Sequence, residues 1–128
     1  AIPDTLVSTT QSTHNPTCIA YRFERNDASF CYTGDTAPSK AIIKLATDCN
    51  LLIHDSAFPE EMADKAKKSN HSTALDAGRA ARDSKVSILV LFHWSHVVEG
   101  KEEEFVDQAK KVFRGEVILA KDGLEVTL

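Results

Sequence analysis

The sequence predicts an α/β fold in which helices pack on a sheet, and three stretches of the chain carry this prediction. Residues 18–24 (CIAYRFE) alternate apolar and polar side chains, which is typical of a strand with one buried face. Residues 86–92 (VSILVLF) are almost continuously apolar, which is typical of a central strand buried on both faces. Residues 102–113 repeat apolar side chains at helical spacing, with acidic residues first and basic residues last. Strands and helices of this kind form layered α/β domains.

Capping and turn residues predict the other elements. Pro38 and Pro59 each open a helix, because proline is tolerated in a first turn, and Ser72 or Thr73 caps a third helix. The turn at residues 122–123 (Asp-Gly) joins two strands in a final hairpin. The predicted ranges are strands at 6–13, 29–32, 50–53, 116–120 and 124–128, a turn at 25–27, and helices at 38–48, 59–68 and from 72 or 73 onwards.

Length and composition indicate one unit, residues 1–128. Hydrophobic residues make up 42% of the chain, which is enough for a packed core. The net charge of −4, with no run of Lys or Arg, gives no electrostatic footprint for a polyanion. Cys18, Cys31 and Cys49 lie in or beside apolar stretches and form no C-x-x-C pair. We therefore expect three buried free thiols in a reducing compartment.

The sequence shows neither a membrane span nor a signal peptide. No stretch reaches ~18 consecutive apolar residues, the length that a spanning helix needs. Residues 1–13 lack a basic region followed by an apolar one. We therefore expect a cytoplasmic protein without a membrane partner.

Two candidate functional residues stand where predicted strands end. Asp35 lies in the segment Tyr-Thr-Gly-Asp-Thr (residues 32–36), between a strand and a helix, where its two oxygens can bridge two cations. The more frequent role of such a residue is a turn or a helix cap. His93 ends the most apolar strand, where a neutral imidazole can bind a metal. The alternative for His93 is a core histidine with one hydrogen bond.

The remaining four histidines have weaker positional support. His14 precedes a strand after a polar segment, and His71 lies at a helix start, where it can be a bystander of a capping turn. His54 and Asp55 follow a strand, and the alternative for Asp55 is a cap for the next helix. His96 is interpreted as a surface residue. No local pattern is a closed metal motif, so any site must be assembled by the fold.

Five short segments stand in order along nearly the whole chain. They are residues 13–16 (THNP) leading into 20–23 (AYRF), 32–36 (YTGDT), 51–58 (LLIHDSAF), 71–74 (HSTA) and 91–95 (LFHWS). Taken together, they resemble the ribonuclease Z-like branch of the metallo-β-lactamase superfamily. The resemblance implies half of an αβ/βα sandwich, a mixed sheet flanked by helices, with metals at the sheet edge.

The resemblance also implies a role for each candidate residue. His14 would bind a first metal ion, His93 a second, and Asp35 would bridge both ions. His71 would donate a proton or stabilise charge on the leaving oxygen, and Asp55 would orient His71 by a hydrogen bond. The family's histidine and carboxylate ligands suit two divalent ions, zinc first, with manganese or iron as alternatives.

One family motif is absent from these residues. The H-x-H-x-D-H motif, which supplies most of the metal ligands, belongs to the N-terminal half of the fold and does not occur here. We therefore expect the chain to be a C-terminal half that needs the N-terminal half as a partner and holds no complete dinuclear site alone. An uncovered sheet face would also favour a homodimer.

The leading functional prediction is a metal-dependent, phosphodiesterase-like hydrolase acting on a small phosphodiester or ester. The first alternative is a tRNA 3′-processing endoribonuclease. The tight hairpin between Tyr21 and Asp35 leaves no room for an RNA-gripping insertion there, and the acidic net charge adds no driving force for RNA binding. A lactonase, a thioesterase and a non-catalytic half-domain also agree with the resemblance.

Overall fold

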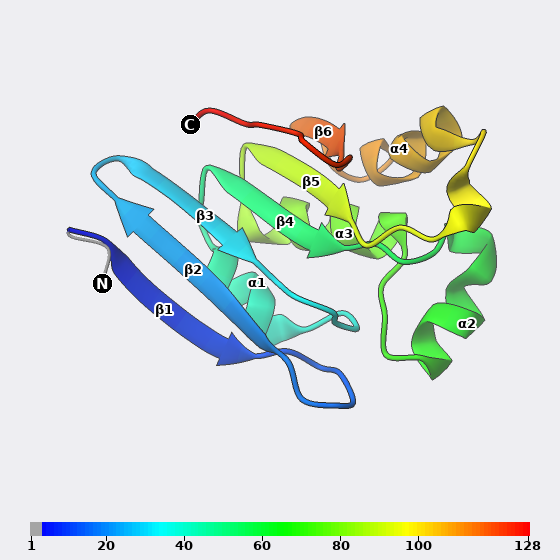
Figure 1. The fold of residues 1–128 in the computed structure, drawn as a ribbon, viewed down its shortest axis with the longest axis horizontal. Helices are drawn as coiled ribbons and strands as arrows, with labels where there is room; N and C mark the ends of the chain where they lie inside the picture. Colours follow the sequence, from blue (N-terminus) through cyan, green and yellow to red (C-terminus); the bar gives the residue numbers. More distant parts are fainter. Residues whose placement is uncertain (1–3) are drawn as a thin grey trace.

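A six-stranded mixed sheet forms the centre of the molecule (Figure 1). The computed structural model describes residues 4–128, so residues 1–3 of the predicted unit lie outside the described residues. Strand order follows chain order, with β1 to β3 antiparallel and β3 to β6 parallel. The strands are β1 (Leu6–Gln11), β2 (Ile19–Arg25), β3 (Ala28–Tyr32), β4 (Leu51–Asp55), β5 (Ile88–Phe92) and β6 (Glu116–Leu119). The predicted α/β class is confirmed.

Side-chain caps set where two of the helices begin. The Ser39 hydroxyl accepts from the Ile42 amide and starts α1. Thr73 and Asp76 form a reciprocal capping box at the start of α3, as the sequence predicts for Thr73. The helices are α1 (Lys40–Ala46), α2 (Ala63–Lys68), α3 (Ala74–Ser84) and α4 (Glu102–Lys110), with short 3-10 turns η1 (Glu60–Met62) and η2 (His96–Val98).

Two helix starts differ from the sequence prediction. Pro38 does not open α1, because Ser39 supplies the capping hydroxyl and the helix begins one residue after it. Pro59 is followed by the 3-10 turn η1 rather than by α-helix, and α2 begins only at Ala63. Both prolines precede helical structure, but a side-chain or 3-10 cap determines the first α-helical residue.

The predicted C-terminal hairpin is wrong. β6 is an edge strand parallel to β5, and residues 124–128 form no strand. The turn itself exists, with Gly123 at φ +83°. Beyond it, Leu124 and Leu128 line a hollow with apolar residues of β3, β4 and β5 and stay partly exposed, so the tail lies along the sheet face instead of pairing with β6.

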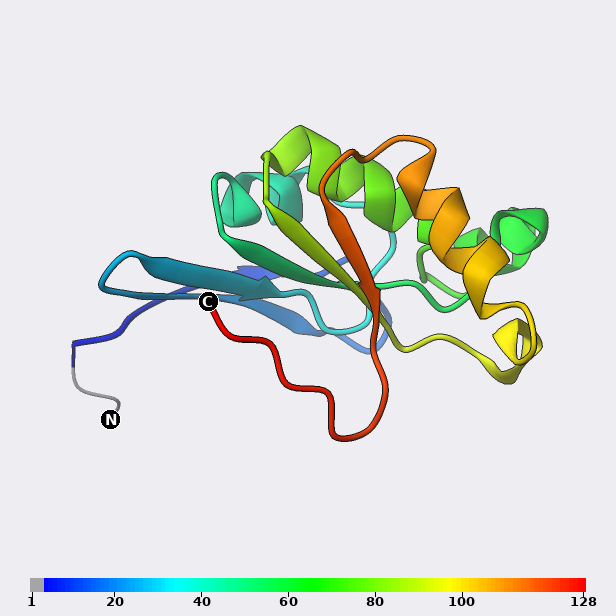
Figure 2. The same cartoon turned by 90° about the horizontal axis from the view of Figure 1, so that it is seen from above.

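Helices cover only one face of the sheet, and the C-terminal tail crosses the other (Figure 2). The core lies between the sheet and α1, α3 and α4, and is lined by small side chains of α3 and larger apolar ones. Its fully buried members include Cys31, Leu52, Ala77, Ala81, Leu89, Leu91, Phe105 and Ala109. Among residues 4–128, no helix has the length and hydropathy needed to cross a membrane.

The three cysteines are free thiols, but they differ in burial. Cys31 and Cys49 are buried, as predicted, and burial raises the pKa of Cys31 to about 12. Cys18 is only half-buried, because it lies in the loop between β1 and β2 rather than in the core. The prediction of three buried thiols is therefore wrong for Cys18.

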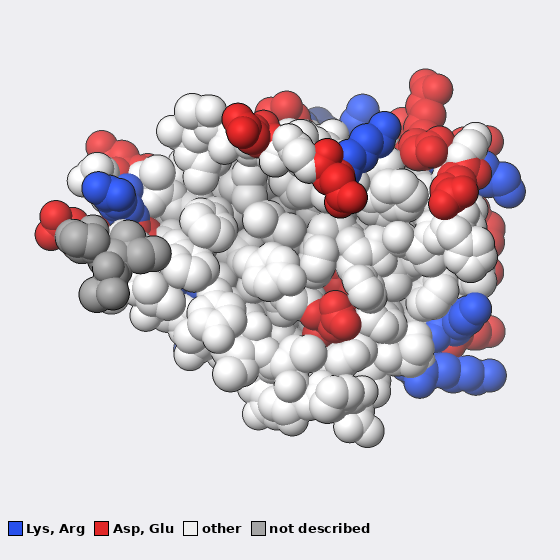
Figure 3. All heavy atoms as spheres, in the orientation of Figure 1, with Lys and Arg blue, Asp and Glu red and all other residues white. Residues whose placement is uncertain are grey.

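The face of the sheet away from the helices is apolar and largely uncovered. Figure 3 shows this face with few charged atoms near its centre and most charges around its rim. Tyr21 stacks beside Phe23, and Phe23 stacks on Phe30 at 4.8 Å between ring centroids. Tyr21 and Tyr32 are each 37% exposed. A continuous aromatic strip of this kind is typical of a surface that meets another protein layer.

Candidate metal centre

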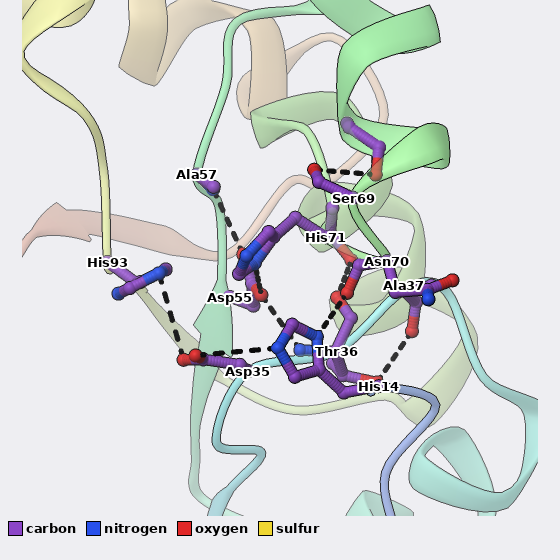
Figure 4. A network of polar contacts seen from close by, with 12 residues as sticks. His14, Asp35, Thr36, Ala37, Asp55, Ala57, Ser69, Asn70, His71 and His93 are labelled. Atoms are coloured by element: carbon purple, nitrogen blue, oxygen red, sulfur yellow. Dashed lines mark hydrogen bonds and ion pairs between the residues drawn. The ribbon is translucent and has the colours of Figure 1, made fainter. Parts of the chain in front are cut away.

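The candidate residues meet at the edge where the parallel strands β3, β4 and β5 end (Figure 4). Asp35 follows β3, Asp55 is the last residue of β4, and His93 directly follows β5. The loop between β1 and β2 brings His14 to this edge, and the connector between α2 and α3 brings His71. Ligands bind at this edge in open α/β sheets, because loops that leave rigid strands aim side chains there.

The Asp35 carboxylate lies between two histidines. Its Oδ2 atom is 3.8 Å from Nε2 of His14, and its Oδ1 atom is 3.8 Å from Nε2 of His93. Gly34 precedes it at φ +62°, a left-handed conformation that glycine adopts without strain. Each carboxylate oxygen therefore faces a different imidazole.

His14 is held in place by the loop that carries it. The Ala37 amide donates to the Thr13 carbonyl at 2.8 Å, and the Thr13 amide donates to the Thr36 hydroxyl at 3.1 Å. These bonds join the loop between β1 and β2 to the segment that follows Asp35. The side chain of His14 is only 10% exposed, so its orientation is fixed by its neighbours.

His71 and Asp55 form a hydrogen-bonded pair beside this carboxylate. Nδ1 of His71 lies 2.6 Å from Oδ2 of Asp55, a residue whose side chain is fully buried. Asp55 also accepts from the Thr36 amide at 2.8 Å and from the Ala57 amide at 3.0 Å. The carboxylate is thereby fixed by three donors, one of which is Nδ1 of His71. The alternative role of Asp55 as a helix cap is not observed.

The donor set fits a divalent metal ion. Two ligand atoms that share one ion must lie closer than the sum of two bond lengths, about 4.2 Å for zinc with imidazole and carboxylate ligands. Both 3.8 Å distances to Asp35 satisfy this limit. His71 also offers a ligand atom within 4.8 Å of those of His14 and Asp35. Among the described residues, His14, Asp35 and His71 form the one group of three that could hold an ion, and His93 lies outside that group but faces the other oxygen of Asp35.

The other two histidines lie apart from this centre. His54 points into the helix-covered core and is 1% exposed, and burial is the main cause that lowers its pKa. Its Nδ1 contacts the Asp55 carbonyl at 2.7 Å, whereas its Nε2 has no hydrogen-bond partner. His96 is exposed in η2, which confirms its interpretation as a surface residue. His93 is 44% exposed at the side chain and is therefore not a core histidine.

The contact between Asn70 and His14 could not be predicted from the sequence. Its main-chain carbonyl lies 2.7 Å from Nδ1 of His14. A carbonyl is present at every residue, so no sequence signal distinguishes the one that meets a histidine. The only hint is the residue type, because asparagine tolerates the left-handed conformation better than most residues.

Solved structures with the same architecture define the class of fold. The metallo-β-lactamase fold protein YhfI from Bacillus subtilis matches with a TM-score of 0.89 and 27% identity, over 97% of this chain and 50% of that one. The short form of human tRNase Z matches with a TM-score of 0.78 and 23% identity, over 99% and 44% of the two chains. This chain therefore has about half of the metallo-β-lactamase fold.

The family model of the β-lactamase superfamily domain matches residues 3–94, and the chain belongs to this superfamily. Ribonuclease Z of Haloarcula marismortui is 44% identical over 96 residues, which cover 75% of this chain and 31% of the relative. Ribonuclease Z of Archaeoglobus fulgidus is 40% identical over 106 residues, covering 81% and 34%. The chain thus spans about a third of the length of these curated relatives.

Proposed function

We propose that this chain is the C-terminal part of a metal-dependent phosphodiesterase. The observation that carries the proposal is the position of Asp35, whose two oxygens each lie 3.8 Å from a different histidine. The His71–Asp55 pair lies next to it, with the rings of His14 and His71 4.8 Å apart. A bridging carboxylate beside an oriented imidazole suits hydrolysis of an ester of phosphoric acid.

His14, Asp35 and His93 would hold two divalent ions, with zinc the best fit to their nitrogen and oxygen donors and manganese or iron as alternatives. Such ions, when bound, lower the pKa of a water ligand and stabilise negative charge on attacking and leaving oxygens. In this assignment His14 and His93 serve different ions, and Asp35 serves both. The 44% exposure of the His93 side chain leaves room for a substrate on that side.

His71 is the proposed proton donor. Its Nδ1 is committed to Asp55, so the proton for the leaving oxygen is held on Nε2 of the imidazolium. The buried carboxylate of Asp55 stabilises this positive charge and keeps the ring in one orientation. After transfer, His71 is neutral and retains the Nδ1 proton that it shares with Asp55. General acid catalysis of this kind is worth roughly 10²–10⁴-fold in rate.

The centre needs ligands that these 128 residues do not contain. We propose that the N-terminal part of the same fold brings an H-x-H-x-D-H motif and packs on the uncovered face of the sheet. Two observations support this: the chain spans about a third of its curated relatives, and this face carries the stacked rings of Tyr21, Phe23 and Phe30. The chain alone is then inactive.

RNA is a second candidate substrate. The observation that favours it is identity of 44% and 40% with two proteins named ribonuclease Z. The net charge of −4 and the short turn between β2 and β3 give this chain no basic arm of its own. The remainder of the protein would therefore make most of the contacts to an RNA substrate. The corresponding activity is cleavage at the 3′ end of tRNA precursors.

One comparison of substrates tests the proposal. The complete protein, loaded with zinc or manganese, is assayed on bis(p-nitrophenyl) phosphate, a precursor tRNA with a 3′ trailer, a thioester and a lactone. We expect hydrolysis of the phosphodiester, and cleavage of the precursor if RNA is the substrate. Turnover of only the thioester or the lactone would replace phosphodiester chemistry with acyl chemistry. No turnover, with metal bound, would indicate a non-catalytic protein.

A further inference from the structure

We propose that Asn70 is a positioning residue, whose main-chain carbonyl sets the tautomer and direction of the His14 ring. This inference rests on the proposed role of His14 as a metal ligand. Nδ1 of His14 lies 2.7 Å from the Asn70 carbonyl oxygen. Because a carbonyl oxygen only accepts, the neutral ring carries its proton on Nδ1 and its lone pair on Nε2. Nε2 is the atom that faces Asp35 at 3.8 Å.

The end of α2 fixes the position of this carbonyl. The Asn70 amide donates to the Lys67 carbonyl at 3.3 Å, and the His71 amide donates to the Ala66 carbonyl at 2.9 Å. Asn70 itself has φ +55°, in the left-handed region. Asparagine is enriched at such positions among residues other than glycine, so its presence here matches the backbone that the contact requires.

Two consecutive residues of this connector therefore act on two different parts of the centre. The carbonyl of Asn70 orients His14, while the side chain of His71 is oriented by Asp55. The rings of His14 and His71 lie 4.8 Å apart, so a shift of the connector displaces both. Asn70 thus couples the metal ligand to the proposed proton donor, without its own side chain touching either metal or substrate.

The first test reads the tautomer directly. In the metal-free complete protein, nitrogen-15 NMR of His14 should show a protonated Nδ1 and an unprotonated Nε2 at a pH where the ring is neutral. The opposite tautomer would overturn the proposal. This measurement requires no turnover, so its result does not depend on whether the protein has the proposed hydrolase activity.

The second test changes the backbone preference at this position. Asn70→Val disfavours positive φ, whereas Asn70→Gly permits it. We expect Asn70→Val to weaken zinc binding about 10- to 100-fold, the usual effect of removing a group that orients a ligand. Asn70→Gly should stay within about threefold of the unmodified protein, because the carbonyl remains in place.

Lys85→Val is the matched control. Lys85 is also a non-glycine residue with positive φ, +60°, but it ends α3 on the exposed surface away from the centre. The same backbone strain there should lower the free energy of unfolding and leave zinc affinity unchanged. Equal zinc affinities for Asn70→Val and Lys85→Val would overturn the proposal. If Asn70→Val does not fold, the tautomer measurement on the unmodified protein decides the question.

Discussion

Nδ1 of His71 lies 2.6 Å from Oδ2 of Asp55, and the Asp55 side chain is fully buried. The two residues are 16 positions apart and come from the connector before α3 and from the end of β4. The carboxylate accepts from two main-chain amides, which fix its position, and it also holds the imidazole.

Removal of the His71 imidazole should affect turnover far more than metal binding. For His71→Ala in the complete protein, we expect kcat for a phosphodiester to fall roughly 10²–10⁴-fold, since a general acid contributes about that much. Zinc affinity should stay within a few-fold, because His71 is assigned no metal bond. His96→Ala, at an exposed histidine in η2, is the control and should change neither quantity. Loss of zinc binding in His71→Ala would make His71 a ligand instead.

Asp55→Asn should lower both stability and turnover. The amide group can replace only part of the acceptor capacity that Asp55 offers to Thr36, Ala57 and His71. We expect the free energy of unfolding to fall by about 1–3 kcal/mol, the cost of leaving a buried polar group without its partner. Denaturant unfolding measures this change, and steady-state kinetics on a phosphodiester measure kcat and KM separately. An unchanged kcat would contradict the assigned orientation role.

Asp35→Asn should reduce the number of ions bound. Because each oxygen of Asp35 faces a different histidine, its replacement weakens both proposed sites at once. We expect the metal content of the complete protein to fall from about two ions to less than one, measured by elemental analysis after dialysis. Asp27→Asn, in the exposed turn between β2 and β3, provides the control. If Asp35→Asn loses only one ion, Asp35 is not a bridge.

The stability of the fold should depend on pH through His54. Burial lowers the pKa of His54 in the folded protein below the value of about 6.5 expected when it is unfolded. The unfolded state then binds more protons at His54. The contribution of His54 to the free energy of unfolding is therefore fully present above a pH of about 6.5, and it is lost as the pH falls towards the folded pKa. Urea titrations between pH 5 and 8, with chelator present, measure this slope.

Two variants test whether the pH dependence of the free energy of unfolding comes from His54. His54→Gln should flatten the pH dependence, whereas His96→Gln, at an exposed position, should leave it intact. His54→Gln itself lowers stability at neutral pH, because it replaces a side chain fitted to the core. A slope that persists in His54→Gln would assign the titration to another group.

Gly78→Ala should destabilise the protein although alanine is the better helix former. A Cβ atom at Gly78 in α3 would lie 2.7 Å from the Ala109 carbonyl oxygen and 2.9 Å from Cγ2 of Val112. We expect a loss of about 1–3 kcal/mol in the free energy of unfolding, typical of overpacking. Arg79→Ala, on the exposed side of the same helix, should change it by less than about 0.5 kcal/mol. Comparable values for both variants would refute the close approach of α3 and α4.

Much of the fold was predictable because local patterns decide it. The alternation in 18–24, the apolar run in 86–92 and the cap at Thr73 each correspond to an observed element. The prediction failed at residues 124–128, where local β-propensity and a turn favoured a hairpin. There the apolar residues line a hollow on a sheet face formed by distant strands, and no local pattern contains that arrangement.

The sequence by itself predicted the α/β class, most of the strands and helices, and a set of candidate residues: His14, Asp35, Asp55, His71 and His93. The tertiary structure decided which atoms of these residues face one another, because their contacts span large separations. His14 meets the Asn70 carbonyl across 56 positions, and Asp35 meets His93 across the ends of two strands. Such pairings depend on how loops leave a shared sheet edge, and side-chain spacing along the chain does not encode that geometry.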